Sequence, residues 1–399
     1  MRRGYYAALK FKNSLRYIFS RGEINACLEK ILNEADADCV DLFYFRFGWS
    51  CGSFQRAQHI ALNMAAQGTL VFYGINPVRE KIQGFFEKKA DNLYLIDIDN
   101  PVVTSCLKKA LFKDRRLKIF HSCSTNIFLK AAEVKKYQKL GSEILYEYID
   151  EISPGVSGYI PGSFYKLHER LAGNKNIFVV SSAIKLYEKI ADIRGEERHI
   201  LAQNGAEYDH WQTPADSYKK FEDIKQIKDK NKPVIGYFGA LAVWFDYKLL
   251  YETARIRRDC EFVLIGWEYD GSFTASGLME CANVHFLGAK DYTVLNSYVT
   301  AFDAACIPFL INDITLSTSP VKLYEYMAAG KPVICTPMPE CAAEPLVKII
   351  ETPEQFAAVI DECLGTADVY GLKAAAQLNG WRGRVSGILN EVKKSCGRQ

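Results

Sequence analysis

The 399-residue sequence lacks long apolar runs, metal-binding cysteine patterns and a large net charge, and each absence excludes a class of protein. No stretch approaches the roughly 18 apolar residues of a membrane-spanning helix. The twelve cysteines form no CxxC pair and no His/Cys cluster at zinc spacing, so we expect reduced core thiols and no metal site. A net charge of +3, without a basic stripe interleaved with aromatic residues, argues against nucleic acid as a partner. The lack of a GxGxxG fingerprint disfavours a Rossmann dehydrogenase.

The first 21 residues carry charge of one sign only, with six Lys or Arg residues and no acid. Five apolar residues share one face of a predicted helix: Ala8, Phe11, Leu15, Ile18 and Phe19. This helix either lies on an anionic membrane surface or packs its apolar stripe against the first domain, and both interpretations stay open. No signal-peptide core precedes Lys10 and Lys12, so we expect a cytoplasmic protein, free or peripheral on the inner face of the cell membrane.

The length of the chain predicts two domains, because one hydrophobic core seldom supports so many residues. Strand-like segments alternate with helical patterns through the first half, at residues 40–45, 69–72, 93–96, 117–120, 144–148 and 177–180. This alternation predicts α/β domains with parallel sheets, in which ligands bind beyond the carboxyl ends of the strands.

In the second half, the stretch STSPVKLYEYMAAGKPVICT at residues 317–336 predicts a loop, a helix, a tight turn and a strand. Ser319 suits the N-cap and Pro320 suits the first helical position. Gly330 ends a helix of about three turns.

One face of this helix carries Lys322 and Glu325, about one turn apart. A helix N-terminus presents unpaired N–H groups to phosphate oxygens, Lys322 adds a positive charge, and Glu325 can accept hydrogen bonds from ribose hydroxyls. The pattern therefore suits a nucleotide diphosphate. It also suits a capped surface helix with a Lys322–Glu325 ion pair, which stabilises by only about 0.2–0.5 kcal/mol.

The run SPVKLYEYMAAGKPVI resembles the donor-nucleotide segment of GT-B-fold glycosyltransferases. The resemblance implies that Ser319 and Pro320 begin a helix that binds the diphosphate of a nucleotide sugar such as a UDP-sugar, with Lys322 at the phosphates and Glu325 at the ribose. It implies two doubly wound Rossmann-like domains facing across a cleft, and a diphosphate neutralised by the helix and Lys322 in place of a metal ion or other cofactor. Many retaining members carry a glutamate where this chain has Ser317, so retention or inversion of the anomeric centre stays open.

Two further matches imply the domain limits. HILAQNGAEYDHW resembles the signature that closes the N-terminal domain of this family, and LNGWRGRVSGILNEVKK resembles its closing helix. We therefore expect an acceptor-binding domain over residues 1–210, a linker over 211–232, a nucleotide-sugar domain over 233–379, and a last helix, 380–399, that packs back on the first domain.

The loop and helix FGWSCGSFQRAQHIALNMAAQG, after the first strand, contribute acceptor-site candidates. Gly48 permits close backbone approach, and Gln55, Arg56 and His59 crowd the start of the helix. The resemblance places these residues in the cleft, where Arg56 would add charge at the diphosphate. A structural role at the helix start is equally open.

Two acids end the strand-like segment LYEYIDEIS and precede a loop. An attacking hydroxyl needs a general base, for which Asp150 is the first candidate and Glu151 the second. His121, after the strand LKIF, is a third candidate. The alternative for these acids is a turn or the cap of the next helix.

In the second domain, Gly239 ends a strand and removes side-chain bulk where backbone can approach a phosphate, although a simple turn would also use glycine. The resemblance places the nucleotide base at the backbone of Ala289 and Lys290, with Tyr292 nearby.

We therefore expect a glycosyltransferase that moves a sugar from a nucleotide-diphosphate sugar to the hydroxyl of a glycan or lipid-linked acceptor. The resemblance points to bacterial cell-surface polysaccharide or glycolipid synthesis. A nucleotide-sugar 2-epimerase of the same fold and a non-catalytic nucleotide-sugar-binding module remain alternatives.

Overall fold

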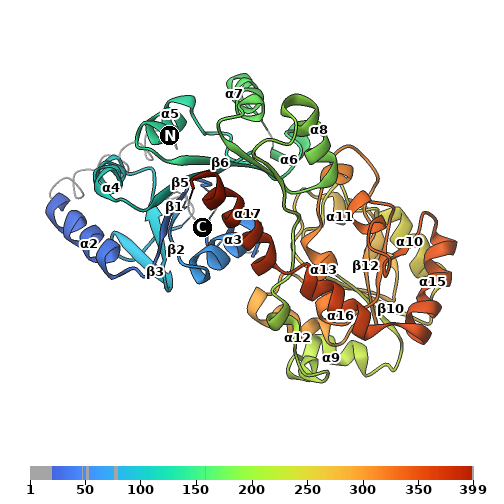
Figure 1. Ribbon diagram of the computed structural model, residues 1–399. Coiled ribbons are helices and arrows are strands. Elements are labelled where there is room, and N and C mark those ends of the chain that lie inside the picture. The colour runs from blue at the N-terminus through green and yellow to red at the C-terminus, as the bar shows by residue number, and fades with distance from the viewer. Residues whose placement is uncertain (1–19, 47, 51–53, 76–79, 158, 398–399) are drawn as a thin grey trace, which may run out of the picture. The chain divides into compact units, whose positions relative to one another are not determined.

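The computed structural model describes residues 20–46, 48–50, 54–75, 80–157 and 159–397, which form two compact units (Figure 1). The first unit contains the described residues up to Ser181, with 187–202 and 385–399, and the second contains 182–186 and 203–384. The basic stretch at residues 1–21 lies almost wholly outside the described residues, so its amphipathic helix stays a prediction.

The first unit is built on an eight-stranded sheet in the order β3-β4-β2-β1-β5-β6-β7-β8. Only β3 runs antiparallel to its neighbour, and the remaining pairs are parallel. The strands are β1 (Cys39–Phe43), β2 (Thr69–Ile75), β3 (Phe86–Ala90), β4 (Leu93–Asp97), β5 (Leu117–Cys123), β6 (Glu143–Tyr148), β7 (Phe178–Ser181) and β8 (His199–Leu201). The register places His121 of β5 beside Phe43 of β1 and Leu145 of β6, so the carboxyl ends of these strands meet at one edge.

Helices connect these strands and flank their sheet. They are α2 (Arg21–Glu34), α3 (Arg56–Ala66), α4 (Pro101–Lys113), α5 (Ala131–Lys139), α6 (Pro154–Ser157), α7 (Gly162–Gly173) and α8 (Ile184–Arg194). The last helix, α17 (Trp381–Ser395), enters the first unit at Val385 and is drawn in dark red beside the elements of that unit in Figure 1. Its Lys393 ammonium donates to Asp38 Oδ2 at 2.7 Å.

The second unit is built on six parallel strands in the order β11-β10-β9-β12-β13-β14. They are β9 (Val234–Phe238), β10 (Glu261–Ile265), β11 (Val284–Phe286), β12 (Ala304–Ile307), β13 (Val333–Cys335) and β14 (Lys348–Ile349). The helices are α9 (Glu222–Lys228), α10 (Tyr247–Ile256), α11 (Ser272–Ala275), α12 (Tyr292–Val299), α13 (Val321–Ala328), α14 (Pro339–Ala342), α15 (Pro353–Thr366) and α16 (Val369–Leu378), with 3-10 turns η1 (Tyr208–Trp211), η2 (Ser217–Lys220), η3 (Leu278–Glu280) and η4 (Thr315–Ser317). None of the described helices is long and apolar enough to cross a membrane.

All six strand-like segments of the first half form strands, and the α/β class with two largely parallel sheets is confirmed. Strands β3, β8 and β14 were not predicted. β3 has the charged edge-strand sequence FEKKA, while β8 and β14 are only three and two residues long, which is too short for a periodic pattern.

The limits of the two units differ from the expected domains. Residues 203–232, expected partly in the first domain and partly in a linker, belong to the second unit. Trp211 is buried there and stacks on Phe238 with ring centres 5.5 Å apart. Ile224 and Ile227 on α9 are buried as well, because the two side chains share one face of the helix and face the core of that unit.

Candidate functional site

Helix α13 carries the two side chains expected at a nucleotide diphosphate, and its start differs from the prediction. The helix has eight residues, about two turns, and its N-cap is Pro320. The expected cap, Ser319, bonds elsewhere: its hydroxyl accepts from the Asn204 N–H at 3.1 Å and its carbonyl accepts from the Asn204 amide at 2.5 Å. The N-cap assignment of Ser319 was therefore wrong, because Ser319 joins the start of α13 to the turn at Asn204.

The ammonium group of Lys322, in the first turn of α13, lies among aromatic rings. It is 5.4 Å from the ring centre of Tyr237 and 4.9 Å from that of Phe309, close enough for cation–π attraction. Burial lowers the pKa of Lys322 to about 8, although the charge of Glu325 acts in the opposite direction. No hydrogen bond or ion pair joins this ammonium group to another described residue, so its donors are available to an anion.

Gly239 provides space beside Lys322, and Gly266 provides space beside Gly239. Gly239 follows β9 with φ +137°, and a Cβ built there would lie 3.1 Å from Lys322 Cε. Gly266, after β10, has φ +155°, and a Cβ there would lie 1.8 Å from the carbonyl oxygen of Gly239. Only residues without side chains allow these two strand ends to approach each other and Lys322 so closely.

Glu325 lies one turn further along α13 and is buried. Burial raises the pKa of its carboxyl group to about 8, while the charge of Lys322 and the hydroxyl of Tyr292 act to lower it. The Tyr292 ring stacks on His210, with ring centres 4.4 Å apart. Near neutral pH the Glu325 carboxyl group is therefore largely protonated and can both donate to and accept from a hydroxyl group.

The expected base-binding loop, after β11, offers its backbone only. Ala289 is exposed, and the Lys290 ammonium donates to Asp223 Oδ2 at 2.8 Å and lies 5.1 Å from the ring centre of Tyr298. The side chain of Lys290 is thus committed to an ion pair within the second unit. This leaves the contact that the resemblance implied, a backbone contact to the base, as a prediction.

In the first unit, a buried ion cluster occupies the edge where β1, β5 and β6 end. Arg56, the first residue of α3, donates from Nε to Glu147 Oε2 at 2.9 Å. The ring of His121 lies between two carboxylates, with Nδ1 3.1 Å from Asp41 Oδ2 and Nε2 3.3 Å from Glu147 Oε1. Asp41, His121 and Glu147 are fully buried and Arg56 is 4% exposed. Sequence reasoning missed Asp41 and Glu147, although a carboxylate inside each of the apolar strands CVDLF and EILYEY was a visible signal.

The surroundings of His121 argue against a role as the general base. An imidazole ring with a carboxylate at each nitrogen satisfies both only as the doubly protonated cation. Burial acts to lower the pKa of His121, but Asp41 and Glu147 outweigh it and raise the pKa to about 9. His121 is fully buried between two carboxylates, which argues against the role of general base that the sequence suggested for it.

The two acids after β6 have different surroundings. Asp150 is partly exposed, and no hydrogen bond joins its carboxylate to a described residue, so it caps no helix. Burial raises the pKa of Asp150 to about 6, with the charge of Arg56 opposing. Glu151 forms an ion pair with Lys189 and accepts from the Tyr148 hydroxyl at 3.4 Å. Asp150 therefore remains available as a proton acceptor, whereas Glu151 is committed to structural contacts.

The other candidates of the first unit are mainly structural. Gln55 is the exposed N-cap of α3 and forms a capping box with Gln58, whose amide also donates to the Gly48 carbonyl at 3.3 Å. His59 is fully buried, and its ring packs edge-on against Phe54 at 4.7 Å. This burial argues against a contact of His59 with a ligand, and its expected place in a binding site stays a prediction. Arg56 likewise is committed to Glu147, which argues against a contact with a diphosphate.

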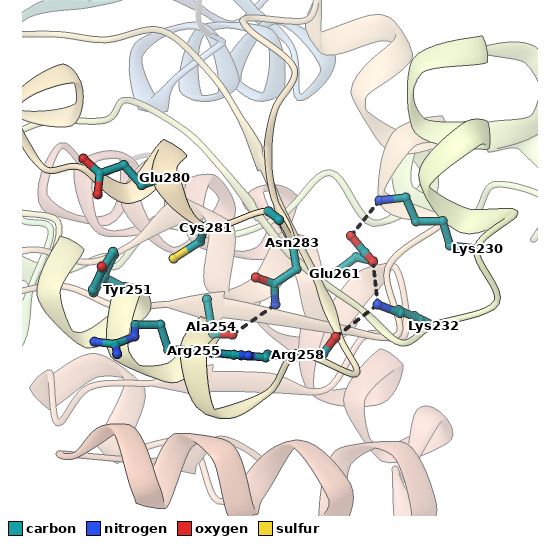
Figure 2. A pocket seen from close by; sticks show the side chains of 11 residues that line it. Lys230, Lys232, Tyr251, Ala254, Arg255, Arg258, Glu261, Glu280, Cys281 and Asn283 are labelled. Atoms are coloured by element: carbon teal, nitrogen blue, oxygen red, sulfur yellow. Dashed lines mark hydrogen bonds and ion pairs between the residues drawn. The ribbon is translucent and has the colours of Figure 1, made fainter.

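A pocket of 530 Å³ in the second unit lies at the other edge of the sheet, where β9, β10 and β11 begin (Figure 2). Its basic residues include Lys230 and Lys232, whose ammonium groups lie 3.0 and 3.3 Å from the buried carboxylate of Glu261. Figure 2 shows both lysines directed at that carboxylate. Parallel sheets bind ligands at the carboxyl ends of their strands, so this pocket is not part of the site at α13.

Comparison with known proteins agrees with this geometry. Residues 232–366 match the model of the family described as glycosyl transferases group 1, a segment that includes α13, Gly239 and the loop after β11. TuaH of Bacillus subtilis (strain 168), assigned as a teichuronic acid biosynthesis glycosyltransferase, is 25% identical over 177 residues. That match covers 43% of this chain and 44% of TuaH, less than half of each protein.

Solved structures match over more of the chain. Anabaena HepE, crystallised with UDP and glucose, has a TM-score of 0.62 and 14% identity, covering 90% of this chain and 99% of HepE. A glycosyltransferase from Rickettsia africae has a TM-score of 0.63 and 15% identity, covering 90% of this chain and 98% of its own. At identities this low, the structural likeness shows the fold alone. The chain therefore has the GT-B fold of glycosyltransferases, and its residues 232–366 match the model of the glycosyl transferases group 1 family.

Proposed function

We propose that this protein transfers a sugar from a nucleotide-diphosphate sugar to a hydroxyl group of an acceptor, with the donor bound by the second unit. The observation that carries the proposal is the ammonium group of Lys322, which lies at the start of α13 without an ion-pair partner among the described residues. An unpaired cation in the first turn of a helix, next to unpaired N–H groups and a glycine, matches the charge and shape of a diphosphate.

The donor chemistry follows from the same elements. The positive end of α13 and Lys322 stabilise the charge that develops on the leaving diphosphate, and we propose that they do so in place of a divalent cation. The buried carboxyl group of Glu325 is suited to the hydroxyls of the ribose. HepE was crystallised with UDP and with UDP-glucose, which makes UDP-sugars the first donors to test.

The acceptor chemistry rests on Asp150 in the first unit. A hydroxyl becomes an effective nucleophile when its proton is taken up as it attacks, and Asp150 is the acid near the end of β6 that no described hydrogen bond occupies. The similarity to TuaH supports an acceptor from cell-surface polysaccharide or glycolipid synthesis.

Incubation of the purified protein with UDP-, GDP- and dTDP-sugars, alone and with glycan or lipid-linked acceptors, tests the proposal. We expect acceptor-dependent release of nucleotide diphosphate and a glycosylated product from at least one donor. Epimerised donor without acceptor would show a 2-epimerase, and binding without turnover would show a non-catalytic module.

Replacing Lys322 with Ala should weaken donor binding by about ten- to a hundredfold, since a charge-assisted hydrogen bond contributes roughly 1.5–3 kcal/mol. Isothermal titration calorimetry with the accepted donor measures the loss. Lys248→Ala, which removes an exposed lysine of α10 in the same unit, is the matched control and should leave the affinity unchanged. Equal affinities for both variants would make Lys322 a structural residue.

The pH dependence of donor affinity distinguishes a role of the charge of Lys322 from a role of its side-chain shape. Because the pKa of Lys322 is lowered to about 8, its ammonium group is present below that pH and is lost as the pH rises through it. Donor affinity should therefore fall above about pH 8. An arginine keeps its charge at those pH values. If the Lys322→Arg variant binds donor, its donor affinity should therefore not fall above about pH 8. A wild-type affinity independent of pH between 7 and 9.5 contradicts the assignment.

Replacing Asp150 with Asn should lower kcat by about 10²–10⁴-fold, the usual contribution of a positioned base. Donor affinity should stay the same, because Asp150 belongs to the first unit. Glu151→Gln is the matched control and should have a smaller effect, since Glu151 is already paired with Lys189. Wild-type turnover in the Asp150→Asn protein would remove this residue from the mechanism, while a modest loss would indicate retaining transfer in which the phosphate takes the proton.

We also propose an anionic membrane surface as a partner of residues 1–21, on the basis of their one-signed charge and apolar stripe. This would place the protein peripherally on the inner face of the membrane. Deleting these residues should reduce co-sedimentation with vesicles that contain anionic lipid, and should leave activity on a soluble acceptor analogue intact. Loss of soluble expression after the deletion would favour packing of this segment against the first unit.

A further inference from the structure

The pocket at the edge where β9, β10 and β11 begin has the size of a small-molecule site. Its volume is 530 Å³, within the range of about 300–1,000 Å³ that is usual for ligand pockets. Its walls come from three segments that are distant in the sequence: the residues before β9, the chain from α10 to the start of β10, and the residues between η3 and β11. Four cationic side chains line it, and we call it the basic pocket: Lys230, Lys232, Arg255 and Arg258.

Hydrogen bonds between these segments hold the walls of the basic pocket in place. The side-chain amide nitrogen of Asn283 lies 3.1, 3.0 and 3.0 Å from three carbonyl oxygens of the chain between residues 254 and 260. The ammonium group of Lys232 donates to the carbonyl of Arg258 at 3.0 Å. A ligand therefore meets backbone walls that are already placed, which lowers the entropic cost of binding.

The buried carboxylate of Glu261 does not cancel the positive charge of the basic pocket. Its oxygens lie 3.0 Å from the ammonium group of Lys230 and 3.3 Å from that of Lys232. The ring of His285 contacts the same carboxylate at 2.5 Å. One carboxylate thus faces two lysine cations. The second acid of the lining, Glu280, is exposed, and Figure 2 shows its carboxylate directed away from Glu261.

The two arginines of the basic pocket make few contacts with acids. No hydrogen bond or ion pair joins the guanidinium group of Arg258 to another described residue. The neighbouring acid, Asp259, is paired with Arg257 at 2.8 Å. Arg255 lies 3.7 Å from Glu252 in a solvent-accessible pair, which contributes little in water. Guanidinium groups present planar sets of N–H donors that match phosphate oxygens, so these two side chains suit a phosphate group.

We propose that the basic pocket binds a small molecule that carries one or two phosphate groups, with Arg255 and Arg258 at the phosphate oxygens. Four cations of the lining face two carboxylates, so a ligand with two negative charges would neutralise the pocket. The concave shape and the volume favour a small molecule, because a nucleic acid is bound by a basic surface that extends over many phosphates.

The basic pocket is separate from the site at α13. Strand β9 begins at the pocket, and Gly239, which lies beside Lys322, follows its other end. Five residues of a parallel strand span about 16 Å, so a phosphate in the basic pocket does not touch Lys322. Binding there does not require the proposed function, and each site can be removed without the other.

Cys281 lines the basic pocket and provides a local readout. Its thiol is partly accessible, as are those of Cys27 and Cys396 in the first unit, which serve as internal controls. Alkylation of the full chain with N-ethylmaleimide, followed by peptide mass spectrometry, gives a reaction rate for each cysteine. Inorganic phosphate, inorganic pyrophosphate and glucose 1-phosphate should slow the reaction of Cys281 alone, and glucose should slow none. Stronger protection by glucose 1-phosphate would identify an organic phosphate as the ligand, and stronger protection by the inorganic ions would identify a free ion.

Replacing Arg258 with Ala should raise the pyrophosphate concentration needed to protect Cys281 by about tenfold or more, because a charge-assisted contact is lost. The variant should fold, since Arg258 is exposed and its guanidinium group bonds to no described residue. Lys248→Ala is the matched control: it removes one positive charge from an exposed position of α10 outside the lining and should change nothing. Lys322→Ala should leave the protection of Cys281 unchanged as well.

Calorimetry with pyrophosphate gives the same decision without the thiol. The Lys322→Ala protein should still bind pyrophosphate, and adding Arg258→Ala should weaken that binding. Protection by none of the phosphates, protection that Arg258→Ala leaves unchanged, or protection lost only in Lys322→Ala overturns the proposal. Protection by anionic vesicles or by polyglutamate, with none from the small phosphates, would show a macromolecular partner and overturns it too. If every nucleotide sugar fails as a donor, only the proposed function fails, because the protection of Cys281 is measured without a donor.

Discussion

The ammonium group of Lys322 is held in place by residues from several elements of the second unit. A lysine side chain is stable this close to a protein core only if something compensates for lost hydration, and here the faces of Tyr237 and Phe309 do so in part. The rings come from the end of β9 and from the segment after β12, so they are placed by the sheet itself. Gly239 then leaves the space beside Lys322 free of a side chain, and Gly266 allows the end of β10 to approach Gly239. The two rings replace the lost hydration of the ammonium group only in part, and Lys322 has no hydrogen-bond or ion-pair partner among the described residues. This is the physical reason to propose an anionic ligand for it.

The two units differ in how they stabilise the charged forms of their ionisable groups. In the second unit Lys322 and Glu325 are each destabilised as ions by burial, which lowers the first pKa and raises the second. In the first unit Arg56 and Glu147 stabilise each other as ions. Burial there raises the pKa of Asp150 instead. These two environments suit the anionic ligand proposed for the second unit and the proton-accepting reaction proposed for the first.

Much of this arrangement could be predicted from local sequence. The helix with Lys322 and Glu325 was correctly placed because proline before it and glycine after it delimit a helix wherever they occur. Asp150 was chosen as a candidate base because an acid that follows a strand lies near the ligand-binding edge of a parallel sheet, and this role stays a prediction. The α/β class followed from alternating strand and helix patterns.

The failures share one cause, which is a partner distant in the sequence. Arg56 and Glu147 are 91 residues apart and Asn204 and Ser319 are 115 apart, so no local pattern shows that Arg56 is buried in an ion pair or that Ser319 has an alternative to capping its helix. The segment at 211–232 was mistaken for a linker because its many lysines concealed the two buried isoleucines of α9. Burial of polar residues is a tertiary property, and sequence alone indicates only that a polar group is present.

The return of the last helix to the first unit has a consequence for the order in which the chain can fold. Val385, Ile388 and Val392 of α17 are fully buried in a unit whose other residues precede Gly205, and Lys393 reaches back to Asp38. On the ribosome, every residue of the second unit has been synthesised before the part of this helix from Val385 onward. The first unit, although it begins first, is thus the later of the two to complete its core, and until α17 arrives it exposes the apolar surface that this helix covers.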